Sequence, residues 1–464
     1  MDINLSKINK VHFIGIKGVA MSGLSVICKQ RGMEVAGSDV AKEFITDKVL
    51  NQEGIYVFQE FNPKNLDWSP DLVVVGASWG EDNFEYAQAL QKKIPIINES
   101  DLRGLLSKEK ITIAVTGAHG KTTTTSLLSY IFTLAGLDPS YLIGTGLIPD
   151  LGINGHWGGG KYFIVEGDEY IKSKKERTPK FLDLSPDATI ITNIEWEHVD
   201  VYKKVQDMEK VFKKLVKKTK SFVAACCDWQ SVENVIGKNN DKVSTYGNKM
   251  CSKWRIGSYT QKLNESYFTV FKDNQVFGEF ELRLLGRFNA INAIGCMIVA
   301  LHYGIGIEVI HEAFKNFSGL ERRMDTDHKK DITFIDDYGH HPTEVSETLH
   351  AIRDMYVKRN IICVFQPHTA SRTLAFLHEF GKCFKDVDEV ILLDIFTSAR
   401  EKEIGITSQD VYETIKKYHP NVRYFGSMED AAKNILSEIK PRDVVVTMGA
   451  GDVYKIKKYL MDNV

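Results

Sequence analysis

The chain has 464 residues, of which 43% are hydrophobic and 26% charged; this composition is typical of globular protein, and the length suggests about three domains. The formal net charge is −2, so the charge balance predicts neither a nucleic-acid nor a membrane partner. The seven cysteines show no metal-knuckle spacing and the N-terminus has no apolar signal core, which together predict a cytoplasmic protein.

The first hundred residues alternate between apolar runs typical of buried strands and helical patterns. Such alternation predicts a parallel sheet with crossover helices. The predicted strands are residues 11–15, 33–37, 72–76 and 94–98, and the first predicted helix is residues 21–30.

A glycine-containing loop, residues 15–23 (GIKGVAMSG), joins the first predicted strand to this helix. Gly15 and Gly18 would let the backbone approach a diphosphate closely. Asp39 ends the next strand, where an acid can meet a ribose hydroxyl. The glycine spacing is not G-x-G-x-x-G, so a purely structural turn remains the alternative.

A second loop, residues 116–124 (TGAHGKTTT), follows a predicted strand at 111–116 and opens a predicted helix at 122–135. In this setting backbone N–H groups and a helix N-terminus wrap phosphate. Lys121 is placed to reach the β- and γ-phosphates of ATP, and the Thr122 hydroxyl to ligate Mg²⁺. The predicted cradle consists of Gly117, Ala118, His119, Gly120, Lys121, Thr122 and Thr123.

Acidic residues follow the next two predicted strands, 162–166 and 189–193. Glu166 opens an EGDE sequence, and His198 lies within TNIEWEHVD. Carboxylates at a strand end suit Mg²⁺, and His198 suits a second metal or the orientation of a nucleophile. Each cluster alone resembles an ordinary polar loop; beside the phosphate loop, they predict metal roles for Glu166 and His198.

A hairpin-rich stretch at 240–285 precedes a predicted helix at 289–303. Asn289 and Asn292 share one face of this helix. An amide can both donate to and accept from an adenine edge, whereas a helix cap with a surface amide is the alternative.

Polar clusters also follow predicted strands in the last third of the chain. One is DDYGHHPTE (336–344), with Asp337, Tyr338 and His340; the other is FQPHTASRT (365–373), with Arg372. Histidine and arginine at the carboxyl ends of parallel strands suit an anionic substrate group. The predicted strands are residues 332–336, 361–365, 390–394 and 444–448.

These patterns predict three α/β domains. A Rossmann-like N-terminal domain would cover residues 1–107, and a central domain of the P-loop ATPase type residues 108–320. A Rossmann-like C-terminal domain would cover residues 321–464.

In this order the motifs resemble the Mur ligases, which build the peptide of bacterial cell-wall precursors. The resemblance spans nearly the whole chain and rests on GIKGVAMSG, TGAHGKTTT, EGDE, TNIEWEH, GRFNAINA, ERRMD, DDYGHHPTE, FQPHTASRT and MGAGD. It implies an ATP- and Mg²⁺-dependent ligase, monomeric or homodimeric, that acts on UDP-N-acetylmuramate. DDYGHHPTE and FQPHTASRT are more similar to the members that add L-alanine than to the later ligases.

The resemblance also implies roles for individual residues. Thr122, Glu166 and His198 would serve Mg²⁺, and Lys121 the transferred phosphoryl group. Asn289 and Asn292 would hold adenine, while Arg323 and Asp337 would contact phosphate and ribose. Gly15, Gly18 and Asp39 would lie along the UDP moiety, and Tyr338, His340 and Arg372 at the incoming amino acid.

Two alternatives stay open. The stretch 172–182 (KSKKERTPKFL) resembles a related recycling ligase, which attaches a preformed tripeptide to the same sugar. A non-catalytic nucleotide sensor would explain the two glycine loops but not the acidic clusters.

Overall fold

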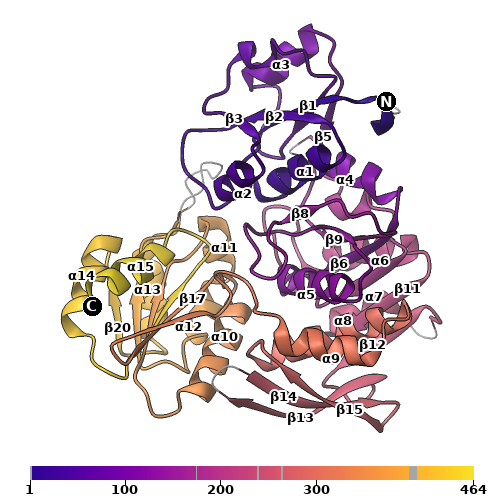
Figure 1. Cartoon of the computed structure of the whole chain (residues 1–464). Coiled ribbons are helices and arrows are strands. Elements are labelled where there is room, and N and C mark those ends of the chain that lie inside the picture. The colour runs from indigo at the N-terminus through magenta and orange to yellow at the C-terminus, as the bar shows by residue number, and fades with distance from the viewer. Residues whose placement is uncertain (1–2, 174, 238–239, 263–264, 397–404) are drawn as a thin grey trace.

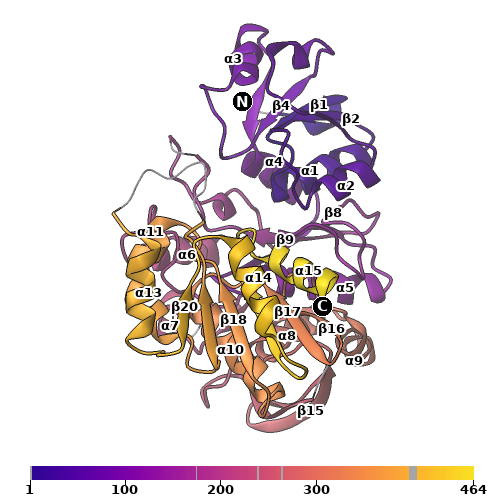
Figure 2. The same cartoon turned by 90° about the vertical axis from the view of Figure 1, so that its left-hand side faces the viewer.

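The computed structural model describes residues 3–464 except 174, 238–239, 263–264 and 397–404. Within this range the strands form three separate sheets of five, ten and six strands. Each sheet and the helices around it form the N-terminal, central and C-terminal units of the chain. The N-terminal unit stands at one end of the molecule, and the other two units lie side by side beneath it (Figures 1 and 2).

The N-terminal sheet is wholly parallel, with the order β3-β2-β1-β4-β5. Buried apolar strands such as β4 form its core between helices on both faces, as expected for doubly wound sheets. Its elements are η1 Leu5–Lys7, β1 Lys10–Ile14, α1 Val19–Gln30, β2 Glu34–Ser38, α2 Asp47–Gln52, β3 Tyr56–Phe58, η2 Pro63–Leu66, β4 Leu72–Val75, α3 Phe84–Gln91, β5 Ile96–Asn98 and α4 Glu99–Ser107.

The central sheet combines a parallel region around β6 with an antiparallel hairpin extension, β13 to β15. The almost wholly buried α8 packs against α5 beneath the sheet. The elements are β6 Ile111–Thr116, α5 Lys121–Leu134, β7 Ser140–Leu142, β8 Gly155–His156, β9 Tyr162–Gly167, η3 Lys180–Leu182, β10 Ala188–Ile191, α6 Val205–Lys218, β11 Phe222–Cys226, α7 Gln230–Ile236, β12 Val243–Gly247, β13 Trp254–Lys262, β14 Glu265–Lys272, β15 Gln275–Leu282, α8 Arg287–His302 and α9 Ile307–Asn316.

The C-terminal sheet has the order β16-β17-β21-β18-β19-β20 and is parallel except for β16. Two hydrophobic clusters lie on its opposite faces, one under α10 to α13 and one under α14 and α15. The elements are β16 Asp325–Lys329, β17 Ile332–Asp337, α10 Pro342–Met355, β18 Ile361–Phe365, α11 Ala370–Ala375, α12 Leu377–Lys382, β19 Glu389–Leu392, α13 Ser408–Lys416, β20 Val422–Tyr424, α14 Met428–Glu438, β21 Val444–Met448 and α15 Tyr454–Asn463.

The predicted three-unit α/β fold is confirmed, and every predicted strand is present within two residues of its predicted start. The sequence analysis missed the strands β3, β7, β8, β11, β16 and β20. In β16 (DTDHK) no side chain is apolar, so no alternating pattern exists to reveal it. Pairing with β17 creates this strand instead.

The N-terminal and central units meet through a contact between two glycines. A Cβ atom added to Gly155 of β8 would lie 2.2 Å from the carbonyl oxygen of Gly23 in α1. Beside it, Asn154 donates a hydrogen bond from Nδ2 to Val19 O at 2.9 Å. The backbones of the two units therefore touch directly, with no side chain between them.

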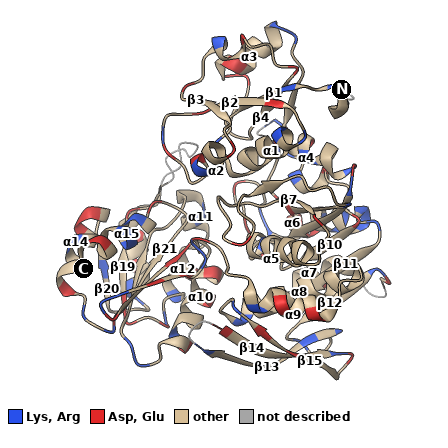
Figure 3. Ribbon diagram, in the orientation of Figure 1, with Lys and Arg blue, Asp and Glu red and all other residues tan. Residues whose placement is uncertain are grey.

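The central and C-terminal units meet partly through apolar contacts such as Trp196 with Phe376, and partly through charged side chains. Lysines, arginines, aspartates and glutamates are interspersed over all three units (Figure 3). At this boundary, buried acidic residues of one unit pair with basic residues of the other, as in Glu197 with Arg372.

Candidate active site

The phosphate loop lies between β6 and α5 and is shaped by two glycines at positive φ. Gly117 has φ +143°, and a Cβ atom there would lie 2.1 Å from Thr192 Oγ1. Gly120 has φ +78°, and a Cβ atom there would lie 2.5 Å from Asn292 Nδ2. Side chains just after β10 and on α8 therefore press against a backbone that only glycine can provide.

The loop is also pinned to the end of β10. The Asn193 side chain accepts a hydrogen bond from His119 N and donates one to His119 O, both at 2.9 Å. Gly120, the N-cap of α5, provides no side-chain cap for the helix. The first amides of α5 are therefore left to an anion, whose charge the helix N-terminus favours.

Lys121 turns back over this loop. Its Nζ donates to Ala118 O at 3.1 Å and lies 3.1 Å from Glu169 Oε1. Burial opposes the charged form, but Glu169 and the acidic residues near it raise the pKa of Lys121. The lysine is therefore cationic at the mouth of the loop.

The acidic side chains after β9 divide into two places. Glu166 accepts a hydrogen bond from Gly144 N at 2.6 Å and another from the Thr122 hydroxyl; burial raises its pKa. Ligand atoms of Asp168, Glu169 and His198 all lie within 4.8 Å of one another. His198 Nε2 lies 3.0 Å from Glu169 Oε1.

Two buried cations support this acidic cluster from behind. Lys180 Nζ contacts Asp168 Oδ2 at 2.8 Å and Glu99 Oε1 at 3.1 Å. Arg103 of α4 pairs with Glu99 and donates to Glu166 O at 3.3 Å. Despite burial, Lys180 and Arg103 hold the pKa of Asp168 far below its usual value.

A pocket of about 370 Å³ opens between the phosphate loop, α8 and α10. Several of the predicted nucleotide residues line it, namely His119, Gly120, Thr123, Asn289, Asn292, Arg323 and Asp337. Burial, opposed by Arg323, raises the pKa of Asp337 to about 6. Asn289 Nδ2 donates to Leu285 O at 2.7 Å, so this amide also binds the backbone just before α8.

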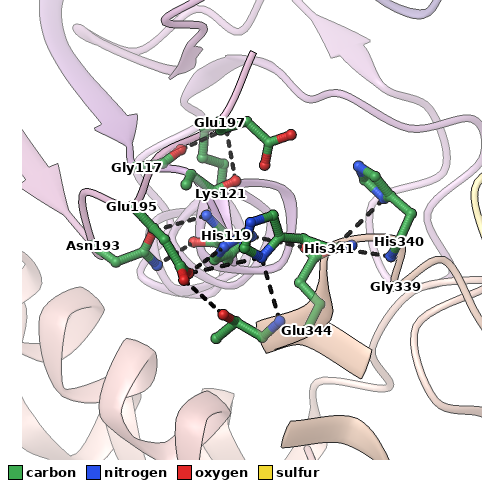
Figure 4. Close-up of polar contacts among 12 residues, drawn as sticks. Gly117, His119, Lys121, Asn193, Glu195, Glu197, Gly339, His340, His341 and Glu344 are labelled. Atoms are coloured by element: carbon green, nitrogen blue, oxygen red, sulfur yellow. Dashed lines mark hydrogen bonds and ion pairs between the residues drawn. The ribbon is translucent and has the colours of Figure 1, made fainter. Parts of the chain in front are cut away.

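On the far side of the pocket, α10 brings the C-terminal unit against the phosphate loop (Figure 4). His119 Nε2 lies 2.9 Å from Glu195 Oε2, and its Nδ1 lies 3.3 Å from Glu344 Oε1. Thr343 donates to Glu195 Oε1 at 2.7 Å. The His341 ring lies 4.7 Å from that of His119.

A second contact between the units involves Arg372. Its Nε and Nη2 donate to Glu197 Oε1 at 3.0 and 2.6 Å, and its Nη1 donates to His368 O at 3.2 Å. Despite burial, Arg372 holds the pKa of Glu197 well below its usual value. The predicted anion-binding arginine is thus held in place from the central unit.

His340 is uncharged. Its Nδ1 lies 3.0 Å from Tyr338 O, so Nδ1 carries the proton and Nε2 keeps its lone pair. Burial and the nearby Arg372 lower the pKa of His340 to about 3. Attraction for an anionic substrate group therefore falls to Arg372, whereas His340 can only accept or donate a neutral hydrogen bond.

Asp39 binds the backbone of the glycine loop in the N-terminal unit. Asp39 Oδ2 accepts from Lys17 N and its Oδ1 from Val40 N, both at 2.8 Å. Trp79 covers the loop, because a Cβ atom at Gly15 would lie 2.5 Å from the indole. Gly18 is the N-cap of α1 without a side-chain cap, which leaves helix amides for a diphosphate.

Three domain families match this chain in order: the Mur ligase family catalytic domain over residues 10–110, the Mur ligase middle domain over 115–300 and the Mur ligase glutamate ligase domain over 322–451. The UDP-N-acetylmuramate–L-alanine ligase of Dictyoglomus turgidum is 35% identical over 459 residues, which cover 97% of this chain and 96% of that protein. The ligase of the same name from Clostridium tetani is 37% identical over 458 residues, 97% of each chain. The chain belongs to the Mur ligase family.

A solved structure supports the fold of this Mur ligase. The UDP-N-acetylmuramate–alanine ligase of Thermotoga maritima has a TM-score of 0.82 and 24% identity, with 98% of each chain covered. At that identity the likeness concerns the fold alone. None of the described helices has the length and apolarity needed to span a membrane.

Some residues that the sequence analysis grouped lie apart in this Mur ligase. Glu166 lies by Thr122, whereas the neighbour of His198 is Glu169. The EGDE motif had pointed to its first acid, but β9 ends at Gly167, and the following turn brings the last acid of the motif to His198.

Sequence reasoning also missed Glu195, Glu197 and Glu344, which join the central and C-terminal units. Glu195 and Glu197 flank Trp196 just before the proposed metal residue His198, and Glu344 closes the GHHPTE sequence. The position of these acids beside recognised motifs could therefore have indicated them. Their pairing with residues of another unit cannot be deduced from a single motif.

Proposed function

We propose that this Mur ligase joins L-alanine to UDP-N-acetylmuramate at the expense of ATP, in the synthesis of peptidoglycan. The observation that carries the proposal is the meeting of three features in one place: a phosphate loop, an acidic cluster and an arginine-bearing strand edge of the C-terminal unit. The full-length relatives named for this reaction support the choice of substrates.

ATP fits the pocket and loop. Residues 117–123 would cradle the phosphates, with Asn289 and Asn292 beside adenine, and Arg323 and Asp337 at phosphate and ribose. Two places suit Mg²⁺, which prefers oxygen ligands: Thr122 with Glu166, and Glu169 with His198. Bound Mg²⁺ would neutralise charge on the phosphate oxygens.

The chemistry has two steps. The sugar's lactyl carboxylate attacks the γ-phosphorus of ATP, so that a C–O–P link forms while the bond to ADP breaks. The amine of L-alanine then attacks the acyl carbon; the C–N bond forms and inorganic phosphate leaves. One proton leaves the ammonium before the attack, and a second leaves nitrogen as the amide forms.

The chain's own groups would serve these steps. Lys121 would stabilise charge developing on the phosphoryl group, an electrostatic contribution worth several kcal/mol in such sites. Arg372 would bind the carboxylate of L-alanine with its planar guanidinium. His340, neutral and held by Tyr338, would orient the amine through Nε2.

The three units would divide the substrates among them. The N-terminal unit, residues 1–107, would bind the UDP sugar along Gly15, Gly18 and Asp39. The central unit, 108–320, would bind ATP, and the C-terminal unit, 321–464, the amino acid. Closure of the units around the substrates would exclude water from the acyl phosphate.

The stretch at residues 172–182, which resembles the tripeptide ligase, lies away from the strand edge that carries Arg372. Lys172 pairs with Asp101 and with Asp183, both at 2.9 Å, and Lys175 with Glu81. The contacts with Asp101 and Glu81 join the central unit to the N-terminal one; Lys174 lies outside the described residues. The stretch therefore supports the meeting of two units rather than the choice of acceptor, and we retain L-alanine.

The deciding experiment measures ADP release with UDP-N-acetylmuramate and either L-alanine or the tripeptide at matched concentration. We expect L-alanine to be used far better. Serine and glycine should retain some activity, because selection for one methyl group yields only about 10–200-fold discrimination. A faster rate with the tripeptide would overturn the named acceptor, and no ADP release with either would favour a nucleotide sensor.

A further inference from the structure

The side chain of His119 leaves the phosphate loop and enters the C-terminal unit. Its ring is 11% exposed and lies between carboxylates of two units: Glu195 contacts Nε2 and Glu344 contacts Nδ1. Figure 4 shows the ring between these two side chains, with Lys121 just behind it. His119 therefore belongs to the proposed phosphate cradle and also contacts α10 of the C-terminal unit.

Glu344 in turn connects several functional segments. It lies in the first turn of α10 and accepts hydrogen bonds from the backbone of His340 and His341, which completes the capping box of the helix. Its Oε1 lies 3.8 Å from the Arg323 guanidinium as well as 3.3 Å from His119. One carboxylate therefore touches the phosphate loop, a nucleotide-side arginine and the backbone of the acceptor-side histidine.

We propose that His119 and Glu344 are positioning residues for the ligase reaction: their ion pair holds the phosphate loop in register with α10, so that the phosphoryl group and the acceptor edge face each other. This inference rests on the proposed function. Neither side chain needs to touch a reacting atom, because each acts through the backbone to which it is anchored.

The charges of the two groups make this contact persistent. Burial disfavours charge on the ring, yet Glu344 and Glu195 raise the pKa of His119 to about 10. Despite its own burial, Glu344 has its pKa held well below the usual value by the cationic His119 and Arg323. At neutral pH the contact is thus a charged pair, 3.3 Å between Nδ1 and Oε1, with little access to water.

A double-mutant cycle tests the pair. His119→Gln keeps a donor near Glu195 but removes the charge and the Nδ1 contact, and Glu344→Gln keeps an acceptor for the helix cap. We expect each to lower kcat by about 10–100-fold, since small misplacements cost this much, with the KM for ATP changed less than about threefold. The kcat of the double variant should lie within about threefold of the kcat of the less active single variant.

The matched control is His350→Gln, on the same helix. This histidine also contacts an aspartate, Asp386 at 3.2 Å, but it is exposed and does not line the pocket. It should turn over normally. Three outcomes would each overturn the proposal. In the first, the kcat of the double variant falls by the product of the two single losses. In the second, only the KM for ATP changes; in the third, the control variant loses as much activity as the test variants.

A second experiment does not depend on catalysis, so it tests this inference independently of the proposed function. Amide hydrogen exchange of the unliganded protein should speed up at His119, whose N–H donates to Asn193, when Glu344, in the other unit, becomes Gln. Unchanged exchange there would overturn the positioning role. If the unmutated protein releases no ADP with these substrates, the proposed function fails while the exchange result still decides the inference.

Discussion

Replacing Glu197 by Gln should weaken binding of the acceptor while leaving ATP binding intact. In the structure the Glu197 carboxylate takes two N–H groups of Arg372, at 3.0 and 2.6 Å, and only 5% of its side chain is exposed. Gln has the same shape but no charge, so the guanidinium loses the partner that fixes its plane.

The size of the effect follows from this geometry. A hydrogen bond to a charged group contributes about 1.5–3 kcal/mol, which corresponds to about 10–150-fold in an equilibrium constant. The KM for L-alanine should rise within that range. The KM for ATP should change less than about threefold, because Glu197 does not line the nucleotide pocket.

The assay is the initial rate of ADP release at varied L-alanine and saturating ATP and UDP-N-acetylmuramate. Glu429→Gln is the matched control, because it removes an exposed carboxylate paired with Lys433 on α14; exposed pairs of this kind contribute little. An unchanged KM for L-alanine, or a rise in the KM for ATP instead, would refute the idea that Glu197 holds Arg372 for the acceptor.

Three further predictions concern the nucleotide side. Lys121→Met should lower ADP release about 10²–10³-fold with an unchanged circular dichroism spectrum; near-normal turnover would contradict the phosphate-loop role. Glu169→Gln and His198→Gln should both shift the Mg²⁺ titration of activity to higher concentration, and curves that overlay the unmutated protein's would remove both residues as ligands. Burial raises the pKa of Asp337 from 3.8 to about 6, so the folded state binds the proton more tightly and loses stability as pH rises through this interval. Urea unfolding at pH 4 and 7 should show the unmutated protein losing about 2 kcal/mol more than Asp337→Asn, and equal losses would count against the raised pKa.

Much of the architecture was predictable because buried parallel strands carry long apolar runs. The LVVV of β4 and the VVVTM of β21 are unmistakable in the sequence. The phosphate loop was equally visible, since strand, glycines, Lys121 and helix follow one another within about a dozen residues. Local order of this kind needs no knowledge of the rest of the chain.

Relations between units could not be predicted in the same way. Glu344 looks like a capping-box residue, and it is one; its contact with His119 depends on how two sheets dock. Arg372 could be expected to bind an anion, but its protein partner lies 175 positions away in sequence. Asp39 was predicted to lie at a ribose; its hydrogen bonds from the backbone amides of Lys17 and Val40 were not predicted.

The contact of Gly23 with Gly155 has a mechanical consequence. Two backbones that touch without intervening side chains cannot slide past each other as a packed side-chain interface can, and any added methyl group would force them apart. The N-terminal and central units are thus held at a fixed separation at this point, and ion pairs such as Lys172 with Asp101 hold them together around it.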